Sequence, residues 1–415
     1  MYNHSTLLNR INSSVKNVRF KSIQGDSCQV PSAPNLKLRK CLVVSKLSRY
    51  EFEKLRHPEL NAEELECLLK NRGNDIQALL HYYNLHKQFE NKVTKTLRDL
   101  GIEVRVVNRI TATAEAFLWS DLVVPVGGDG TFLLAANRAR CIKRPFVGLN
   151  SHPSRSEGSL CLHRYYSEHI EEAFKKILHG DYHWFNRNRI RTTVRGDGLY
   201  DCDRFRKVDL HDHTMKTRMV SRQIDKNDVE PKNVDSRCTR VLPYLALNEV
   251  FMGENMSARV SHLQICIDDQ DTVTKTKSSG LCVCTGTGCT SWHMSINRIS
   301  SQCARRLLET VRNLSPSSDI KATAKEISLA YNDSLTFPPS DERMCYSLRE
   351  LISVGVWPHP KGIKSRGFAK KLTVTSRCID AGLVIDGSIC YPFNDGLQAT
   401  LEVLPEDTLY TITLD

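Results

Sequence analysis

The stretch that decides the fold reads Leu122-Val-Val-Pro-Val-Gly127-Gly128-Asp129-Gly130-Thr131-Phe-Leu-Leu134. An apolar run of strand length enters a glycine turn, and an apolar segment compatible with a helix leaves it. Glycine has no Cβ, so the backbone of this turn can approach a ligand closely. Successive amides that point into a helix N-terminus form an anion site. The pattern therefore predicts a strand, a tight turn and a helix, with an anion site at the turn.

The turn carries one carboxylate, Asp129. A carboxylate is unsuited to binding a phosphate directly. We therefore expect Asp129 to act as a general base toward a hydroxyl, or as a second-shell magnesium ligand. The alternative is an ordinary strand-to-helix turn in which Asp129 is only the N-cap of the helix.

On both sides of this stretch, short apolar strands alternate with amphipathic helices. Such alternation predicts a mostly parallel sheet wound on both faces, with the glycine turn at the carboxyl end of a strand, where these sheets bind ligands. The expected strands are Lys40–Lys46, Ile102–Val107, Leu122–Val126 and Pro145–Asn150, and the expected helical segments are Ser48–Asn71, Ile76–Leu100, Ala112–Trp119 and Thr131–Arg140.

After Asn150 the pattern changes. One more helix is expected at Ser167–Leu178, and short β-branched or alternating segments then predict a mostly-β second domain. Its expected strands are Arg189–Arg195, Tyr244–Phe251, Leu263–Ile267, Gly280–Cys284, Leu372–Ser376, Ala381–Ile385 and Leu397–Leu404. Two polar stretches, 197–240 and 315–341, are interpreted as mobile surface insertions. We thus divide the chain into residues 1–40, an α/β domain at 41–155 and a β-rich domain at 156–415.

The composition limits the classes of protein and of binding partner that fit this chain. At 415 residues and 40% hydrophobic content the chain can bury a large core, and two domains are expected. The net charge of +11 is scattered rather than gathered in one basic run, so it suits anionic small molecules as well as nucleic acid. No run reaches the roughly 18 apolar residues of a membrane span. We expect a soluble protein without a nucleic-acid or membrane partner.

The first forty residues differ from the rest. They hold seven basic residues and a single acid, Asp26, with frequent serine and with apolar residues near one helical face. This composition is typical of a mitochondrial transit peptide, and a disordered basic tail is the alternative.

The fifteen cysteines are spread along the chain, which favours a reducing compartment. Cys282, Cys284 and Cys289 lack the paired spacing of a structural zinc site and are interpreted as buried thiols.

Two further motifs carry polar groups suited to a nucleotide. Asn248 and Glu249 form a polar pair inside an apolar strand, and such a pair can grip a ribose diol; two solvated side chains at a strand end are the alternative. The segment Cys284-Thr-Gly-Thr-Gly-Cys-Thr-Ser-Trp292 runs from a strand into a Thr/Gly turn with a helix start at Thr290–Ser291. It offers amides and hydroxyls to phosphate or adenine, whereas a plain turn is the alternative.

The Gly-Gly-Asp-Gly-Thr sequence resembles the signature shared by NAD kinases, diacylglycerol and sphingosine kinases and, more loosely, phosphofructokinases. The order of this motif, the Asn–Glu pair and the Thr/Gly turn resembles the NAD kinase family over most of the chain from Leu42 onward. The segments Asn150–Leu162 and Ile385-Asp386-Gly387 with Phe393–Gly396 look most like the mitochondrial branch of that family.

The resemblance implies a function and a set of site residues. Asp129 would be the catalytic base that deprotonates the adenosine-ribose 2′-hydroxyl of NAD, and ATP with Mg²⁺ would donate the phosphoryl group. The implied nucleotide-binding residues are Gly128, Gly130, Thr131, Asn248, Glu249, Thr285, Thr287, Thr290, Ser291 and Trp292. No protein metal ligand is implied, and a homodimer in the mitochondrial matrix is expected.

The chain also departs from the family pattern. The family turn reads like T-P-T-G-S-T-A-Y, and the aspartate of a preceding Arg-Gly-Asp-Gly is replaced by Ser279. A lipid kinase of the diacylglycerol or sphingosine type is the first rival, because it shares the glycine signature. A non-catalytic nucleotide-binding protein is the second. A redox enzyme is disfavoured, since no G-x-G-x-x-G follows the first strand.

Overall fold

The structure is a computed structural model that describes residues 36–140, 142–197, 208–209, 237–270, 272–315, 320–352 and 363–415. These residues belong to one structural unit, 33–415. Nearly all of the predicted transit segment and most of the polar stretch 197–240 lie outside the described residues.

A four-stranded parallel sheet, in the order β2-β1-β3-β4, carries the glycine turn. Its apolar central strands, β1 and β3, are buried along almost their whole length, as a parallel sheet covered on both faces requires. This confirms the parallel sheet predicted from the sequence. The strands are β1 (Lys40–Ser45), β2 (Glu103–Val107), β3 (Leu122–Gly127) and β4 (Leu149–Asn150).

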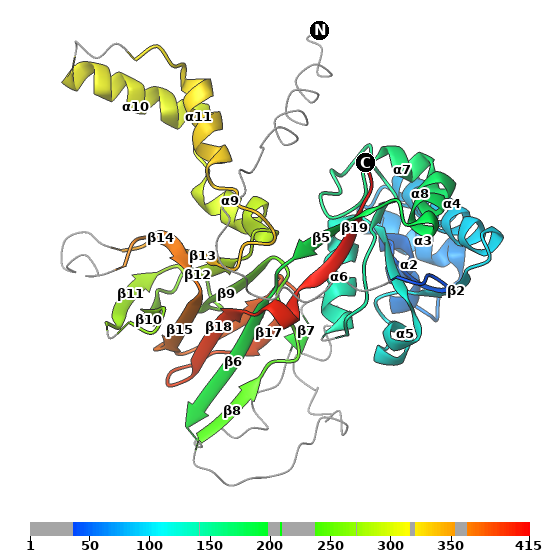
Figure 1. The fold of residues 1–415 in the computed structure, drawn as a ribbon, viewed down its shortest axis with the longest axis horizontal. Coiled ribbons are helices and arrows are strands. Elements are labelled where there is room, and N and C mark those ends of the chain that lie inside the picture. Colours follow the sequence, from blue (N-terminus) through cyan, green and yellow to red (C-terminus); the bar gives the residue numbers. More distant parts are fainter. Residues whose placement is uncertain are drawn as a thin grey trace. The chain divides into compact units, whose positions relative to one another are not determined.

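Helices cover both faces of this sheet (Figure 1). Because side chains alternate along a strand, Cys41 and Val43 pack with helices on one face, and Leu42 and Val44 pack with helices on the other. The first face is covered by α4 (Ile76–Asp99) and α8 (Ile170–His179), and the second by α5 (Ala114–Trp119) and α6 (Asp129–Ala139). The doubly wound arrangement is thus confirmed.

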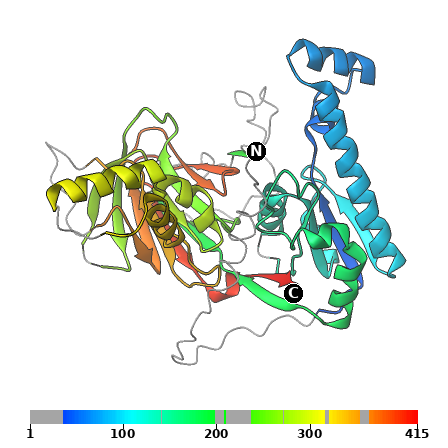
Figure 2. The ribbon, with the colours of Figure 1, turned by 90° about the horizontal axis from the view of Figure 1, so that it is seen from above.

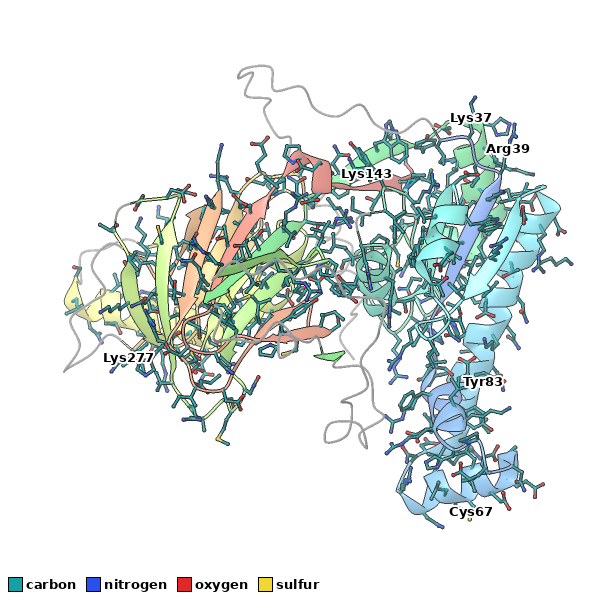
Figure 3. All side chains as sticks on the ribbon, turned by 90° about the horizontal axis from the view of Figure 1, so that it is seen from below. Lys37, Arg39, Cys67, Tyr83, Lys143 and Lys277 are labelled. Atoms are coloured by element: carbon teal, nitrogen blue, oxygen red, sulfur yellow. The ribbon has the colours of Figure 1, made fainter. Side chains whose placement is uncertain are left out.

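Helix α4 has 24 residues and is about 36 Å long, so only its C-terminal part packs on the sheet. Its first turns carry α2 (Arg49–Arg56) and α3 (Ala62–Asn71) around a small apolar cluster of their own, as Figure 2 shows. Cys67 and Tyr83 lie on this helical arm (Figure 3). The helical segment expected at 48–71 is therefore two helices, divided at Pro58 and restarted by the capping box of Asn61.

The β-rich part consists of two antiparallel sheets that share one hydrophobic cluster. Their orders are β11-β10-β15-β18-β6-β8 and β14-β13-β12-β9-β16-β17-β7. The first sheet contains β6 (Ile190–Asp197), β8 (Arg237–Val241), β10 (Ser261–Ile267), β11 (Thr274–Ser278), β15 (Lys371–Ser376) and β18 (Gln398–Val403). The second contains β7 (Val208–Asp209), β9 (Glu249–Glu254), β12 (Leu281–Cys284), β13 (Met344–Leu348), β14 (Arg366–Ala369), β16 (Ala381–Ile385) and β17 (Ile389–Pro392).

Several expected elements need correction. The strand expected at Pro145–Asn150 is regular only at its last two residues, and the helix expected at Ser167–Leu178 is broken at His169 into α7 (Tyr165–Glu168) and α8. The strand expected from Tyr244 begins only at Glu249, because a distant carboxylate holds the amides before it.

The stretch 315–341 is not a mobile insertion throughout, because it contains the capped helix α11 (Ala324–Asp333). This helix pairs with α10 (Ser301–Leu314), which the sequence reading missed. Between β12 and α10 lies the short helix α9 (Trp292–Asn297).

The end of the chain returns to the first sheet. Strand β19 (Leu409–Thr413) pairs with β5 (His183–Arg187), and Phe146 forms a parallel bridge with Thr411. Helix α8 and Ile412 also belong to the hydrophobic cluster of the first sheet. A division of the chain near residue 155 stays a prediction. No helix among the described residues is long and apolar enough to cross a bilayer.

Candidate functional site

The glycine turn joins β3 to α6, as predicted. A Cβ on Gly127 would lie 2.3 Å from Oγ1 of the buried Thr131, so only glycine fits there. A Cβ on Gly130 would meet no atom within 4 Å, and this residue is exposed. Gly127 therefore lets the turn close, whereas Gly130 leaves free space beside the backbone of the helix N-terminus.

The carboxylate of Asp129 is held from outside its own helix. Its Oδ1 accepts the amide of Leu160 at 2.8 Å, and its Oδ2 accepts the amide of Ser159 at 3.1 Å. The N-cap of α6 is Gly128, and no side chain caps this end. The alternative in which Asp129 serves as the N-cap is therefore wrong. Instead, the 159–160 loop fixes the orientation of the carboxylate.

Arg187, at the end of β5, is buried within the electrostatic range of this carboxylate and donates to the Thr/Gly turn. Its Nη1 donates to Oγ1 of Thr287 at 3.4 Å, while its buried Nε has no partner. Burial lowers the pKa of Arg187 to about 10, and the charge of Asp129 opposes that shift. The guanidinium thus stays protonated at neutral pH. Sequence reasoning missed this residue, because one arginine in an alternating strand looks like a surface residue.

The Asn–Glu pair and the Thr/Gly turn are packed together. Nδ2 of Asn248 donates to Oγ of Ser291 at 3.1 Å, and the amide of Thr285 donates to the carbonyl of Asn248 at 2.9 Å. A Cβ on Gly288 would lie 2.1 Å from that same carbonyl oxygen. Trp292 stacks on Phe251 with the ring centroids 4.5 Å apart. The two motifs therefore pack into one cluster, which we call the Asn248 corner: Asn248, Thr285, Gly288 and Ser291.

The predicted helix start in this turn is only partly correct. Residues Gly288–Thr290 form a single 3₁₀ turn (η4), and α9 begins at Trp292. Thr290 is exposed on this turn, whereas Thr285 and Thr287 are buried.

Beneath this corner lies Asp386, which no sequence argument singled out as a site residue. Its carboxylate accepts the amides of Leu247, Asn248 and Glu249 at 2.9, 2.8 and 3.1 Å. Burial, and then the charge of Asp386, raises the pKa of Glu249 to about 8. Glu249 is therefore a neutral acid at pH 7, and its Oε2 is buried without a partner.

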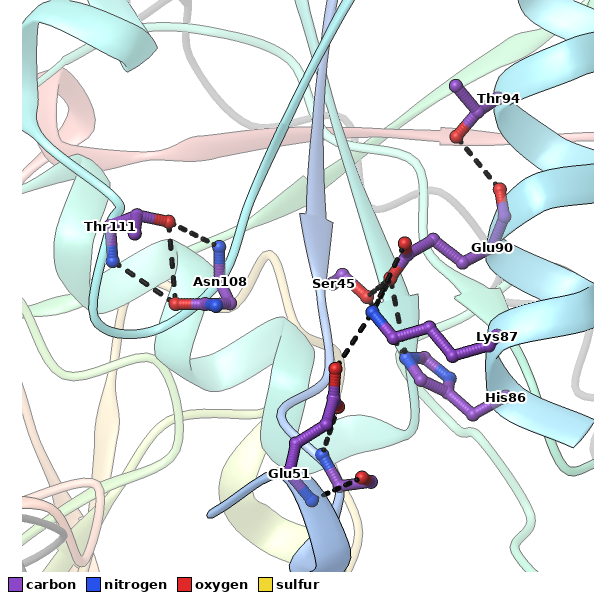
Figure 4. A network of polar contacts seen from close by, with 9 residues as sticks. Ser45, Glu51, His86, Lys87, Glu90, Thr94, Asn108 and Thr111 are labelled. Carbon is purple, nitrogen blue, oxygen red and sulfur yellow. Dashed lines mark hydrogen bonds and ion pairs between the residues drawn. The ribbon is translucent and has the colours of Figure 1, made fainter. Parts of the chain in front are cut away.

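Positive charge and a polar network lie behind the glycine turn. Lys46 Cβ approaches the position of a Cβ on Gly127, and the charge of Arg155 helps to lower the pKa of Lys46, after burial. At the end of β1, Ser45 Oγ donates to Glu90 and contacts Nε2 of His86 at 3.0 Å (Figure 4). Burial lowers the pKa of His86 to about 4. This network anchors α4 to β1, the strand that pairs with β3 beside the turn.

Among the described residues, no three His, Cys, Asp or Glu side chains are placed to hold a metal ion. Cys284, Cys289 and Cys345 instead form a buried cluster with Phe337. The carboxylate of Asp129 fits a Mg²⁺ ion that arrives with nucleotide phosphates, because Mg²⁺ is commonly bound by one or two carboxylates plus phosphate oxygens.

The described contacts thus join the predicted residues in two groups. Arg187 donates to Thr287 and senses the charge of Asp129, and Asn248, Thr285, Gly288 and Ser291 contact one another directly. The backbone of Thr285–Gly288 connects the groups.

Comparison with known proteins supports the resemblance that the sequence motifs indicate. The chain is 36% identical to rat mitochondrial NAD kinase 2, over 93% of this chain and 90% of the relative. It is 37% identical to the Xenopus tropicalis protein of the same name, over 92% of each, and 36% identical to the human one, over 90% of this chain and 84% of the relative.

A solved NAD kinase from Archaeoglobus fulgidus, in complex with ATP, aligns with a TM-score of 0.47 and 15% identity over 91% of this chain and 94% of the other. No family model matches the sequence. On the strength of its full-length relatives, the chain belongs to the NAD kinase family and is similar to the mitochondrial NAD kinase 2 proteins.

Proposed function

We propose that this protein transfers the γ-phosphoryl group of ATP to the 2′-hydroxyl of the adenosine ribose of NAD, which yields NADP and ADP. The observation that carries the proposal is a carboxylate, Asp129, fixed by two backbone amides at the glycine turn, in a chain that also packs Asn248 against the Thr/Gly turn and whose relatives are NAD kinases. We place the protein in the mitochondrial matrix, in accord with the names of those relatives and the composition of residues 1–40.

Asp129 acts as the general base. As the ribose 2′-oxygen attacks the γ-phosphorus, its proton passes to the carboxylate and the bond to the ADP oxygen breaks. The amides of Ser159 and Leu160 each occupy one lone pair of the carboxylate and hold it in one orientation. General-base assistance of this kind accelerates a reaction about 10²–10⁴-fold.

Charge neutralisation supplies the other part of catalysis, because a loose phosphoryl-transfer transition state needs positioning and counter-charge more than covalent help. Arg187 is a buried cation with a free Nε beside Asp129, and Lys46 and Arg155 add positive charge behind the turn. The backbone at Gly128 and Gly130 approaches the phosphates. A Mg²⁺ ion that arrives with ATP would neutralise part of the phosphate charge, and Asp129 would hold it only through water, as a second-shell ligand.

The Asn248–Glu249 pair recognises the ribose. Because Glu249 is protonated at neutral pH, it can donate a hydrogen bond as well as accept one, and a ribose hydroxyl would satisfy its unpartnered Oε2. The side-chain amide of Asn248 is held by Ser291, and its side-chain oxygen, Oδ1, would accept a hydrogen bond from a second hydroxyl. Thr285, Thr287 and the turn up to Trp292 line the rest of the dinucleotide site. A homodimer is part of this proposal, since the family resemblance implies one.

The direct test is a comparison of acceptors. The purified chain is incubated with ATP, Mg²⁺ and NAD⁺, and NADP⁺ is read with an NADP-specific dehydrogenase. Parallel reactions contain sphingosine or diacylglycerol in place of NAD⁺. We expect product with NAD⁺ alone; phosphorylated lipid without NADP⁺ would overturn the proposal in favour of the lipid kinase.

A further inference from the structure

We infer that Asp386 is the positioning residue of the dinucleotide site: it fixes Asn248 and Glu249 and ties them to the helix that carries Asp129. The inference rests on the proposed function, since it concerns the site proposed for NAD. Asp386 itself lies beneath that site and is separated in sequence from Asn248 by 138 residues.

The first step of the argument is the bonding of the carboxylate. Three successive amides, those of Leu247, Asn248 and Glu249, converge on its two oxygens at 2.8–3.1 Å. In return, the amide of Asp386 donates to the carbonyl of Glu249 at 2.9 Å. The neutral side chain of an asparagine could not replace the Asp386 carboxylate, because it would offer only one accepting oxygen to the three amide donors.

The second step concerns what these bonds impose. Consecutive amides that point to one anion form a concave turn, which keeps Asn248 out of the ladder and lets β9 begin only at Glu249, the partner of Cys284. Without the anion, the three buried amides would lack acceptors, and the segment would be free to continue as the strand that its apolar sequence predicts. Asp386 therefore selects the conformation in which this pair is presented as a site.

The third step is the link to the catalytic helix. Asn137, buried on α6 eight residues after Asp129, donates to Oγ of Ser388 at 3.3 Å, in the same turn as Asp386. The β16–β17 turn thus contacts the base-bearing helix on one side and the ribose-binding pair on the other. Its backbone is built for this position, since Asp386 and Gly387 take left-handed φ values of 47° and 63°.

A positioning role predicts a split between the two nucleotides. With the turn released, NAD⁺ loses its ribose contacts, whereas ATP keeps the glycine turn and the cations beside it. In Asp386→Asn we expect NAD⁺ to bind at least tenfold more weakly by titration calorimetry, with Mg²⁺–ATP binding changed less than twofold. Steady-state kinetics should show the same split in KM.

Asp268→Asn is the matched control. Asp268 also sits at a positive φ, 49°, and its carboxylate also accepts two backbone amides, at 2.8 and 2.9 Å, but it holds an exposed hairpin of the same β-rich part. We expect this variant to keep the affinity of the parent for both nucleotides. Asn137→Ala is the second variant. It leaves the carboxylate in place, removes the link between its turn and α6, and should weaken NAD⁺ binding severalfold in a folded protein.

Each outcome decides the inference. NAD⁺ affinity within twofold of the parent in Asp386→Asn overturns it, and so does an equal loss for NAD⁺ and ATP, which a merely structural residue would cause. If Asp386→Asn does not fold, unchanged NAD⁺ binding by Asn137→Ala overturns it. A parent chain that binds NAD⁺ but forms no NADP⁺ would refute the proposed kinase, and the binding comparison would still test Asp386.

Discussion

Replacing Gly288 by alanine should destabilise the protein and damage its site together. The added Cβ would lie 2.1 Å from the carbonyl oxygen of Asn248 and within 2.7 Å of two more backbone atoms of that residue. Backbone on both sides cannot move aside as a flexible side chain does. Overpacking of this kind costs about 1–3 kcal/mol. Moving the turn away from Asn248 would also strain the bond from the Thr285 amide to the Asn248 carbonyl, 2.9 Å long, for about 0.5–1.5 kcal/mol more.

We therefore expect Gly288→Ala to lower the free energy of unfolding by about 1.5–4.5 kcal/mol, from the sum of these two costs. Urea unfolding followed by tryptophan fluorescence measures it, because Trp292 lies next to the perturbed turn and stacks on Phe251. Gly130→Ala is the matched glycine: it has open space and a helical position, so stability should rise by about 0.5–1 kcal/mol.

Activity separates the two variants in another way. The Cβ of Gly130→Ala would occupy the space proposed for phosphate, so this stable variant should lose at least tenfold in kcat/KM. A Gly288→Ala protein as stable as the parent, or a fully active Gly130→Ala protein, would refute the reasoning about the turn.

Two further predictions concern buried ionisable groups. Glu249 has its folded pKa raised to about 8 from an ordinary 4.5, so the native state holds its proton more tightly and the parent loses stability as pH rises through that window. Glu249→Gln has no proton to lose, so this pH-dependent loss is absent in the variant. The free energy of unfolding of Glu249→Gln minus that of the parent should therefore grow from about pH 5 to about pH 8. A difference that does not change with pH would contradict the raised pKa of Glu249. Arg187→Met should lower kcat by about 10²–10³, as expected for loss of one charged donor at the transferred group, and Arg187→Lys should lose less. Equal kcat values for the two variants would show that the charge is not used.

The sequence predicted those parts of the fold and site whose cause is local. The apolar run Leu122–Val126 and the glycines after it predict the strand, turn and helix by themselves, because their backbone requirements are contained in the motif. The continuous apolar run Cys41–Val44 likewise predicts a strand of a sheet that is covered on both faces.

The missing parts depend on contacts between residues far apart in the chain. Asp386-Gly387 looks like any hairpin turn until the amides of residues 247–249 are seen on its carboxylate. Arg187 has no local signal for proximity to Asp129. The same cause misplaced the start of β9, since an apolar sequence predicts a strand from Tyr244 and only the distant carboxylate interrupts it. Local pattern cannot report such long-range hydrogen bonds.

Asp129→Asn tests the central claim most directly. Asparagine keeps the size of the side chain and one accepting oxygen for the amide of Leu160 or Ser159, so the fold and nucleotide binding should persist. The base is removed, and NADP⁺ formation from ATP, Mg²⁺ and NAD⁺ should fall about 10²–10⁴-fold while the Kd for NAD⁺ changes little. NADP⁺ formation at the rate of the parent would contradict the assignment of Asp129 as the base.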